Sequence, residues 1–163
     1  MAWFFAKSKK GMCDKWLGSL VLQAAEESLK RICSTPKKVL LLPPDITRAH
    51  SAAGPITNVL YHFFSQMADV YVMPTLGQHV PHTPEQNQWM FDDIPEEKIL
   101  KHNWKTDGKL IGSIPAEYVK VITEDKADWE IPISVNKILF DEKWDIILNI
   151  GHEIGRASCR ERV

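Results

Sequence analysis

Cysteine is scarce in this sequence, and its distribution excludes two common structural devices. The 163 residues include three cysteines, Cys13, Cys33 and Cys159. The number is odd, and the spacing matches neither a metal-binding nor a redox motif. Reduced, structural thiols therefore fit the sequence better than a disulfide framework.

The sequence also lacks any apolar run of the roughly 18 to 20 residues that a membrane-spanning helix needs. Its first residues, MAWFFAKSKK, place the positive charge after a very short apolar stretch, which is the reverse of a secretory signal. We therefore expect a cytoplasmic protein with no membrane partner.

Neither sign of charge is in excess, because 20 Lys and Arg residues face 21 Asp and Glu residues, for a net charge of −1. The longest basic stretch, KSKK at residues 7–10, fits a solvated terminus. Nucleic-acid binding needs Lys and Arg gathered on one face, so no nucleic-acid partner is expected. The sequence contains no Walker loop, no G-x-S-x-G elbow and no dinucleotide fingerprint.

Apolar spacing predicts alternating helices and strands. Helical stripes cover residues 15–32 and 52–66. Short apolar runs predict strands at Val39 to Leu42, at Asp69 to Pro74 and at Asp145 to Gly151. The first run, VLLL, does not alternate with polar residues, which indicates a strand covered on both faces, as in a parallel sheet.

The middle of the chain carries a helix start and a β-rich region. Thr83, Pro84 and Gln86 have the spacing of an N-cap, a first-turn proline and a capping-box partner. A further helical turn is expected at PEEKIL, and hairpins or an edge excursion at KLIGSI, YVKVIT and EIPISV. The sequence therefore predicts an α/β fold with a doubly wound, mostly parallel, Rossmann-like sheet and a β-hairpin excursion.

Three loops follow the predicted strands at their carboxyl ends, where open α/β sheets bind ligands. The first loop carries Asp45, Thr47, Arg48 and His50, the second Gly77, Gln78, His79 and His82, and the third His152. A plain turn would not require so many polar residues. We therefore expect a binding site formed by these loops.

Arg48 and Asp45 allow more than one interpretation. The guanidinium of Arg48 suits a carboxylate or phosphate ligand, and Asp45 could hold that guanidinium, orient a histidine or contact a substrate hydroxyl. A local Asp–Arg pair that fastens the loop is the simpler alternative. The sequence does not choose between them.

His79 is the candidate for proton transfer, because imidazole exchanges protons near neutral pH. A histidine hydrogen-bonded within a turn is the alternative. A metal pair with His82 is less favoured, since Pro81 lies between them and no carboxylate or cysteine has suitable spacing. The remaining candidates, His50, His62 and His102, are expected to be structural or exposed.

Taken together, LLPPDITRAHSAAGPIT, MPTLGQHVPHTPEQ, IPAEYVK, SVNKIL and WDIILNIG resemble the N-terminal domain of the lactate racemase family, which are nickel-pincer-dependent 2-hydroxyacid racemases and epimerases. The resemblance runs from about Lys37 to Gly151. It implies that Asp45 and Arg48 bind substrate and that His79 is one of two catalytic histidines. The implied substrate is a small 2-hydroxycarboxylate.

The resemblance also implies a cofactor, a nickel pincer nucleotide that accepts hydride and is held by a lysine and a nickel-binding histidine. Both residues, and the second catalytic histidine, follow the strand that is DIILNIG in this sequence. The family pattern fails after Gly151, and His152 is not assigned the catalytic role. The implied metal and attachment residues are thus absent from this chain.

The last residues, EIGRASCRERV, resemble a translated sequencing adapter. We therefore predict three segments: residues 1–36 with a packing helix, an incomplete racemase-like domain at 37–152, and a foreign tail at 153–163. Such a fragment is expected to be inactive and to leave an exposed apolar patch at residues 146–148. Alternatives are a non-catalytic module that binds an anionic metabolite through Arg48 and His79, and an interaction domain with no small-molecule site.

Overall fold

The computed structural model describes residues 4, 6, 14–32, 34–77 and 79–151. These residues divide into two compact units. The first unit contains the described residues up to Lys101 together with those from Trp144, and the second runs from His102 to Lys143. The predicted tail at 153–163, and His152 and Gln78, lie outside the described residues.

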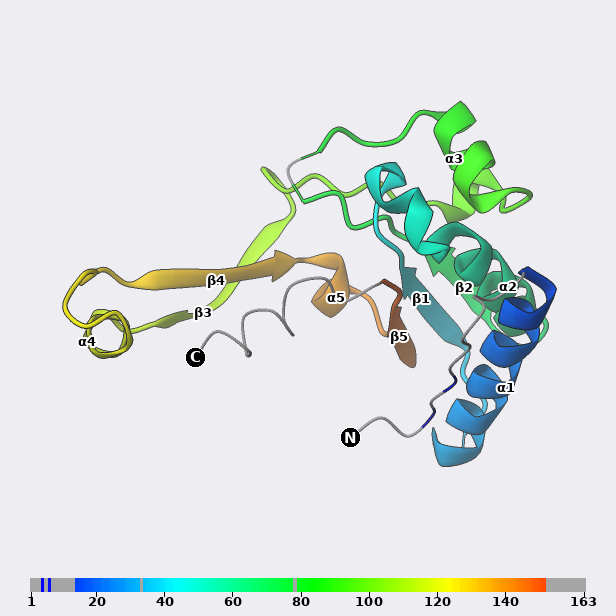
Figure 1. The fold of residues 1–163 in the computed structure, drawn as a ribbon, viewed down its shortest axis with the longest axis horizontal. Helices are drawn as coiled ribbons and strands as arrows, with labels where there is room; N and C mark the ends of the chain where they lie inside the picture. The colour runs from blue at the N-terminus through cyan, green and yellow to red at the C-terminus, as the bar shows by residue number, and fades with distance from the viewer. Residues whose placement is uncertain (1–3, 5, 7–13, 33, 78, 152–163) are drawn as a thin grey trace. The chain divides into compact units, whose positions relative to one another are not determined.

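The first unit is built on a parallel three-stranded sheet in the order β2-β1-β5 (Figure 1). Its strands are β1 (Lys38–Leu42), β2 (Asp69–Val72) and β5 (Ile146–Asn149). In register, Leu40 of β1 lies opposite Tyr71 on one side and Ile147 on the other. The sheet and the antiparallel hairpin of the second unit confirm the predicted α/β class.

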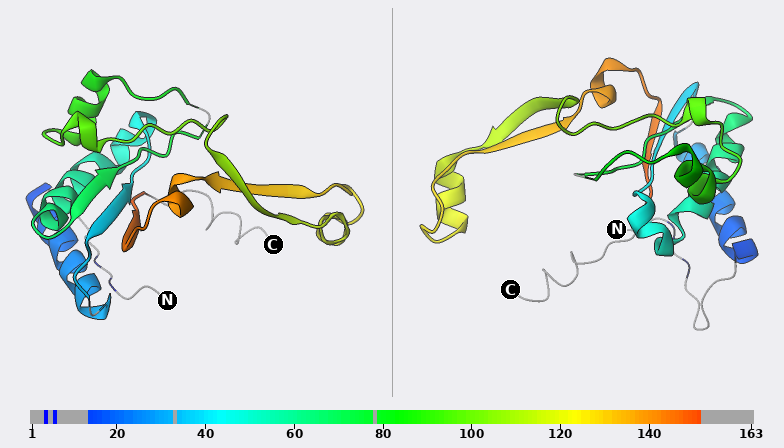
Figure 2. Two further views of the ribbon diagram at one scale, coloured as in Figure 1. Left: turned by 180° about the vertical axis from the view of Figure 1, so that it is seen from behind. Right: turned by 90° about the horizontal axis from the view of Figure 1, so that it is seen from above.

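Helices α1 (Asp14–Ile32) and α2 (Ala53–Ser65) lie on the same side of this sheet (Figure 2). Alternate strand residues and the two helices form the core, which includes Ala25, Val39, Leu41, Leu60, Phe64, Val70, Val72 and Ile146. Leu40 projects from the opposite face of β1 and is also fully buried. Burial of consecutive residues confirms that this non-alternating strand is covered on both faces.

Helix α3 (Pro84–Phe91) begins where the capping box predicts. The Thr83 hydroxyl accepts from the Gln86 amide at 3.3 Å, and the Gln86 side chain accepts from the Thr83 amide at 3.0 Å. Two 3₁₀ helices complete this unit, η1 (Ile46–Ser51) after β1 and η2 (Glu96–Lys98) at the predicted PEEKIL turn.

The second unit is an antiparallel pair, β3 (Gly108–Ile114) and β4 (Ile131–Asn136), with α4 (Ala116–Ile122) between them and α5 (Ile138–Asp141) after them. The prediction of a β-run at residues 118–123 is wrong, because these residues lie almost entirely in α4. Pro115 at the N-cap and Glu117 in the first turn favour a helix there. These start signals outweigh the β propensity of Val119, Val121 and Ile122.

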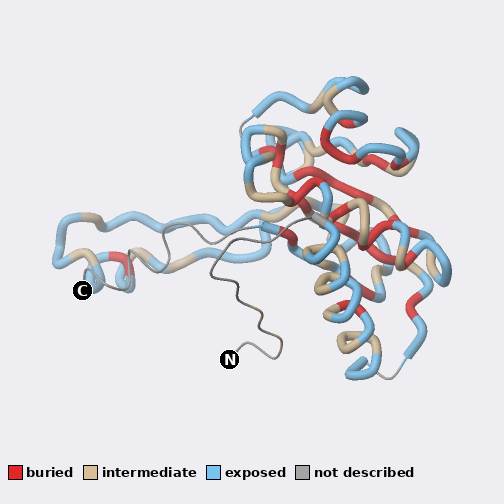
Figure 3. The backbone as a smooth tube through the Cα atoms, turned by 45° about the vertical axis from the view of Figure 1, so that its right-hand side comes forward, coloured by how far each residue is buried: buried red, intermediate tan, exposed pale blue. Residues whose placement is uncertain are grey.

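Burial differs sharply between the units. Among the described residues of the second unit, only Val119 is buried, and Figure 3 colours most of this unit as exposed. In the first unit the expected patch at 146–148 is confirmed only for Ile147, which is 44% exposed, whereas Ile146 is buried beneath the helices. Within the described part of the chain, no helix has the length and apolar character to cross a membrane.

Candidate functional site

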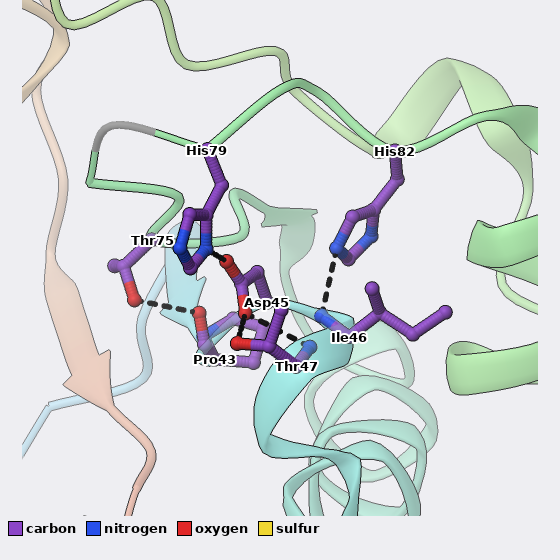
Figure 4. A network of polar contacts seen from close by, with 7 residues as sticks. All are labelled: Pro43, Asp45, Ile46, Thr47, Thr75, His79 and His82. Carbon is purple, nitrogen blue, oxygen red and sulfur yellow. Dashed lines mark hydrogen bonds and ion pairs between the residues drawn. The ribbon is translucent and has the colours of Figure 1, made fainter.

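The loops after β1 and β2 remain side by side beyond the ends of the strands. The amide of Met73 donates to the carbonyl of Leu41 at 2.9 Å, and the amide of Thr75 donates to the carbonyl of Pro43 at 2.8 Å. The Thr75 hydroxyl donates to the same carbonyl at 3.0 Å (Figure 4). Proline ends each strand by removing a donor, but the carbonyl of Pro43 still accepts, and this holds the two candidate loops together.

Asp45 lies at the centre of this junction. This residue is 4% exposed and its side chain caps η1: Oδ1 accepts from the Thr47 amide at 3.0 Å and from the Thr47 hydroxyl. Its other oxygen, Oδ2, pairs with Nδ1 of His79 (Figure 4). Asp45 therefore joins the first loop to the second.

The environment of Asp45 favours its ionised form. Burial acts to raise the pKa of Asp45, but the hydrogen bonds from Thr47 and His79 outweigh burial and hold the pKa below its ordinary range. A carboxylate accepts hydrogen bonds without donating any, so the shared hydrogen belongs on Nδ1 of His79.

A tight turn positions His79. The amide of His79 donates to the carbonyl of Leu76 at 2.9 Å, and Gly77 within the turn has a φ of 58°, which glycine adopts without steric cost. The imidazole is 58% exposed. Since Nδ1 is bound to Asp45, Nε2 is the nitrogen that can exchange a proton with a ligand.

Arg48 is exposed on η1, and its backbone amide donates to the carbonyl of Asp45 at 2.9 Å. Across residues 14–32, 34–77 and 79–151, no carboxylate forms an ion pair with its guanidinium. The carboxylate of Asp45 is bound to Thr47 and His79 instead. Of the alternatives left open by the sequence, the geometry matches an aspartate that orients a histidine rather than a local Asp–Arg pair.

His82 occupies a different environment from His79. Its Nε2 accepts from the Ile46 amide at 2.9 Å, and its Nδ1 lies 3.0 Å from Oδ1 of Asn87. Both ring nitrogens are therefore used within the protein. No group of three or more His, Cys, Asp or Glu side chains in the described part of the chain could hold a metal ion.

The other described histidines are not part of the Asp45–His79 pair. His62 pairs with Asp93 at 2.8 Å, and His102 contacts Asn136 at 2.6 Å in the second unit. His50 is exposed at the end of η1. These contacts agree with the structural or exposed roles predicted for all three residues.

Asn87 and Glu96 are the residues that sequence reasoning missed. Asn87 is buried, and its amide donates to both carboxylate oxygens of Glu96, at 3.1 and 3.0 Å. The sequence did carry a signal for the contact of Asn87 with His82, because the capping box at Thr83 makes His82 the N′ residue and Asn87 the N4 residue of α3. Residues at N′ and N4 often pack against each other, most commonly as a hydrophobic pair.

An apolar cavity of about 330 Å³ lies elsewhere in the first unit, between α1, α2 and β5. Its lining includes Val21, Ala25, Leu60, Phe64 and Ile150. None of Asp45, Arg48 and His79 lines it, and it offers no titratable group. The candidate site residues Asp45, Arg48 and His79 therefore lie at the loop junction and not in this cavity.

Comparison with known proteins identifies similar folds. Neither the protein-family models nor the curated proteins give a match to this chain. A crystal structure of a protein from Thermotoga maritima superposes with a TM-score of 0.71 at 23% identity, over 84% of this chain and 34% of the other.

The apoprotein of lactate racemase from Thermoanaerobacterium thermosaccharolyticum superposes with a TM-score of 0.53 at 16% identity, over 81% of this chain and 31% of the racemase. At these identities the likeness shows a distant relationship of fold. The chain spans about a third of the length of each of these two structures.

Proposed function

We propose that this chain is the N-terminal part of a 2-hydroxyacid racemase or epimerase in which His79 transfers the hydroxyl proton. The observation that carries the proposal is the pairing of His79 Nδ1 with the buried Asp45 carboxylate, together with the exposed Arg48 on the 3₁₀ helix that Asp45 caps. The distant likeness of fold to a lactate racemase supports it.

The chemistry explains why these residue types are needed. The hydrogen on the α-carbon of a hydroxycarboxylate is a very weak acid, so inversion by simple deprotonation is unfavourable. If the α-hydrogen leaves as hydride while a base takes the hydroxyl proton, the product is a planar 2-keto acid, and hydride returned to the opposite face inverts the centre. In this proposal, His79 Nε2 takes and returns the hydroxyl proton.

Asp45 and Arg48 have complementary roles in this proposal. Asp45 fixes the imidazole through Nδ1, so that Nε2 carries no hydrogen and can accept the proton. Arg48 binds the substrate carboxylate through its planar guanidinium. Holding the carboxylate also fixes the position of the neighbouring hydroxyl relative to His79.

The resemblance noted in the sequence implies a nickel pincer nucleotide in the complete enzyme, which would supply a hydride acceptor. The described residues do not fit that group by themselves, because His82 has both nitrogens bound and His79 has one nitrogen bound to Asp45. The part of this chain in the reaction is therefore confined to the proton and the substrate carboxylate.

Ligand binding to the 163-residue chain tests the substrate site directly. We expect lactate to perturb the NMR signals of His79 and of the Arg48 side chain, and propane-1,2-diol, which has the hydroxyl but no carboxylate, to leave them unchanged. Arg48→Gln should weaken lactate binding. Arg31→Gln, which removes the same charge from the end of α1, should not.

Activity of the complete gene product tests catalysis. With cofactor supplied, His79→Gln should lower racemisation of its hydroxyacid by on the order of 10²- to 10⁴-fold, the usual contribution of a general acid or base. Retained racemisation by this variant would contradict the role of His79. Binding that depends on Arg48, without racemisation of any hydroxyacid in a panel, would favour a non-catalytic module that binds an anionic metabolite.

A further inference from the structure

A series of hydrogen bonds connects Glu96, Asn87 and His82 to the backbone of the candidate site. We propose that His82 is a positioning residue for the Asp45–His79 pair, acting through the backbone amide of Ile46. The significance of this pair for catalysis rests on the proposed function, whereas the contacts that connect His82 to it are independent of any reaction.

The contacts fix the orientation of each group in turn. An ionised Glu96 has only acceptors, so Asn87 must direct its NH₂ group toward both carboxylate oxygens, at 3.1 and 3.0 Å. The carbonyl oxygen of Asn87 then faces Nδ1 of His82 at 3.0 Å and requires a hydrogen there. A neutral imidazole carries one hydrogen, so Nε2 is left as an acceptor.

That acceptor is bound by the amide of Ile46, which donates to Nε2 at 2.9 Å (Figure 4). Ile46 is the residue directly after Asp45 and the first residue of η1. The next amide, that of Thr47, donates to Asp45 itself at 3.0 Å. The first two amides of η1 are thus held by different side chains, one from the second loop and one from the cap.

Packing keeps the imidazole of His82 in place. Its ring stacks on Phe91 with a centroid separation of 6.1 Å and an interplanar angle of 29°. Phe91 is fully buried, and Asn87 is 4% exposed. The ring plane is therefore set by a buried aromatic and a buried amide, so Nε2 has a fixed direction toward the Ile46 amide.

The consequence concerns the peptide between Asp45 and Ile46. Because its N–H donates to His82, this peptide keeps one orientation. In that orientation the Asp45 side chain points toward His79. Without that bond the peptide can rotate, and Asp45 can keep its bond to Thr47 while losing its bond to His79. His82 would thereby affect proton transfer without touching substrate.

The first test uses the histidine tautomer, which NMR reads directly from the two ring nitrogens. In the wild-type chain at neutral pH, His82 should carry its hydrogen on Nδ1, with Nε2 unprotonated and accepting. Glu96→Gln leaves this exposed position polar but lets Asn87 rotate, and it should give His82 a mixture of tautomers. An Nε2–H tautomer in the wild type would overturn the proposal.

The second test compares two variants at His82. His82→Leu removes the acceptor, and His82→Gln retains one. In His82→Leu the Ile46 amide should exchange with solvent roughly five- to tenfold faster, as expected for loss of one net hydrogen bond. The Nδ1–H signal of His79 should weaken or broaden because its bond to Asp45 is no longer held. His82→Gln should restore both signals, which a purely structural effect on folding would not.

The outcomes separate this inference from the proposed function. Unchanged His79 and Ile46 signals in His82→Leu would overturn the positioning role, whatever the complete enzyme does. If His82→Leu fails to fold, the His82 tautomer in the wild type and the exchange rate of the Ile46 amide in Glu96→Gln still test the positioning role. Confirmed NMR effects with no hydroxyacid binding would leave the positioning role intact and contradict the proposed function alone.

Discussion

At the scale of single residues, the charge of Asp45 links the site to the stability of the fold. The hydrogen bonds from Thr47 and His79 hold the pKa of Asp45 below its ordinary value of 3.8 despite burial. A carboxyl whose folded pKa is depressed stabilises the fold above its unfolded pKa, and this contribution is lost as the pH falls through the folded pKa.

We therefore predict a pH-dependent difference between the wild type and Asp45→Asn. At neutral pH the variant should be less stable by about 1–3 kcal/mol, because charged hydrogen bonds are replaced by neutral ones. The difference should shrink as the pH falls below 3.8. Urea unfolding at a series of pH values measures it, and a difference that stays constant through this range would contradict the depressed pKa.

The sequence identified the polar side chains of the candidate site, but it did not predict which of them bind one another. The positions of Asp45, Arg48 and His79 after strand ends already indicated a loop site. Asp45 can reach His79 only because the two loops stay side by side beyond the prolines. The hydrogen bonds from Thr75 to the carbonyl of Pro43 hold the loops together there. No periodicity reports such a contact, because it joins residues 32 positions apart.

At the scale of elements, α2 and α3 approach each other more closely than a side chain would allow. Gly54 lies in the first turn of α2, and a Cβ there would lie 2.2 Å from the backbone carbonyl oxygen of Met90 in α3. A backbone atom cannot rotate away as a side chain can. The contact therefore depends on glycine for space rather than for backbone conformation.

Gly54→Ala should force α3 away from α2 and destabilise the fold by about 1–3 kcal/mol, the usual cost of overpacking. Because α3 carries Asn87, the variant should also disturb the contact of His82 with Ile46. Gly18→Ala within α1 is the matched control, since its Cβ would meet nothing closer than the side chain of Val59 in α2, at 3.8 Å. That change should stabilise the protein by about 0.5–1 kcal/mol, so a similar effect of the two variants in chemical unfolding would argue against crowding at Gly54.

Elements with local start signals were the most predictable from the sequence. The capping box of Thr83 and Gln86 located α3, and the non-alternating VLLL located a strand buried on both faces. The β-branched residues at 118–123 favour a strand, but the proline and glutamate that precede them favour the helix that forms. The local start signals determine the structure of this segment because tertiary packing contributes little: of the described residues in that unit, only Val119 is buried.

At the scale of the whole molecule, the exposed apolar side chains of the second unit are expected to promote association. Tyr118, Val121 and Ile122 of α4 are 58%, 77% and 59% exposed. Positions separated by three and four residues lie on the same face of a helix, so these side chains form one apolar stripe. Contiguous exposed apolar surface favours association in water.

We predict that the 163-residue chain associates in a concentration-dependent manner through α4. Replacing Val121 and Ile122 with lysine should shift the sedimentation-velocity distribution toward monomer, because the stripe loses its most exposed members. Glu124→Lys adds the same +2 charge within the second unit without removing apolar surface, and it should leave association unchanged. Equal dispersal by both variants would show that net charge, rather than the α4 stripe, controls association, whereas dispersal by the lysine pair alone would locate the contact on α4.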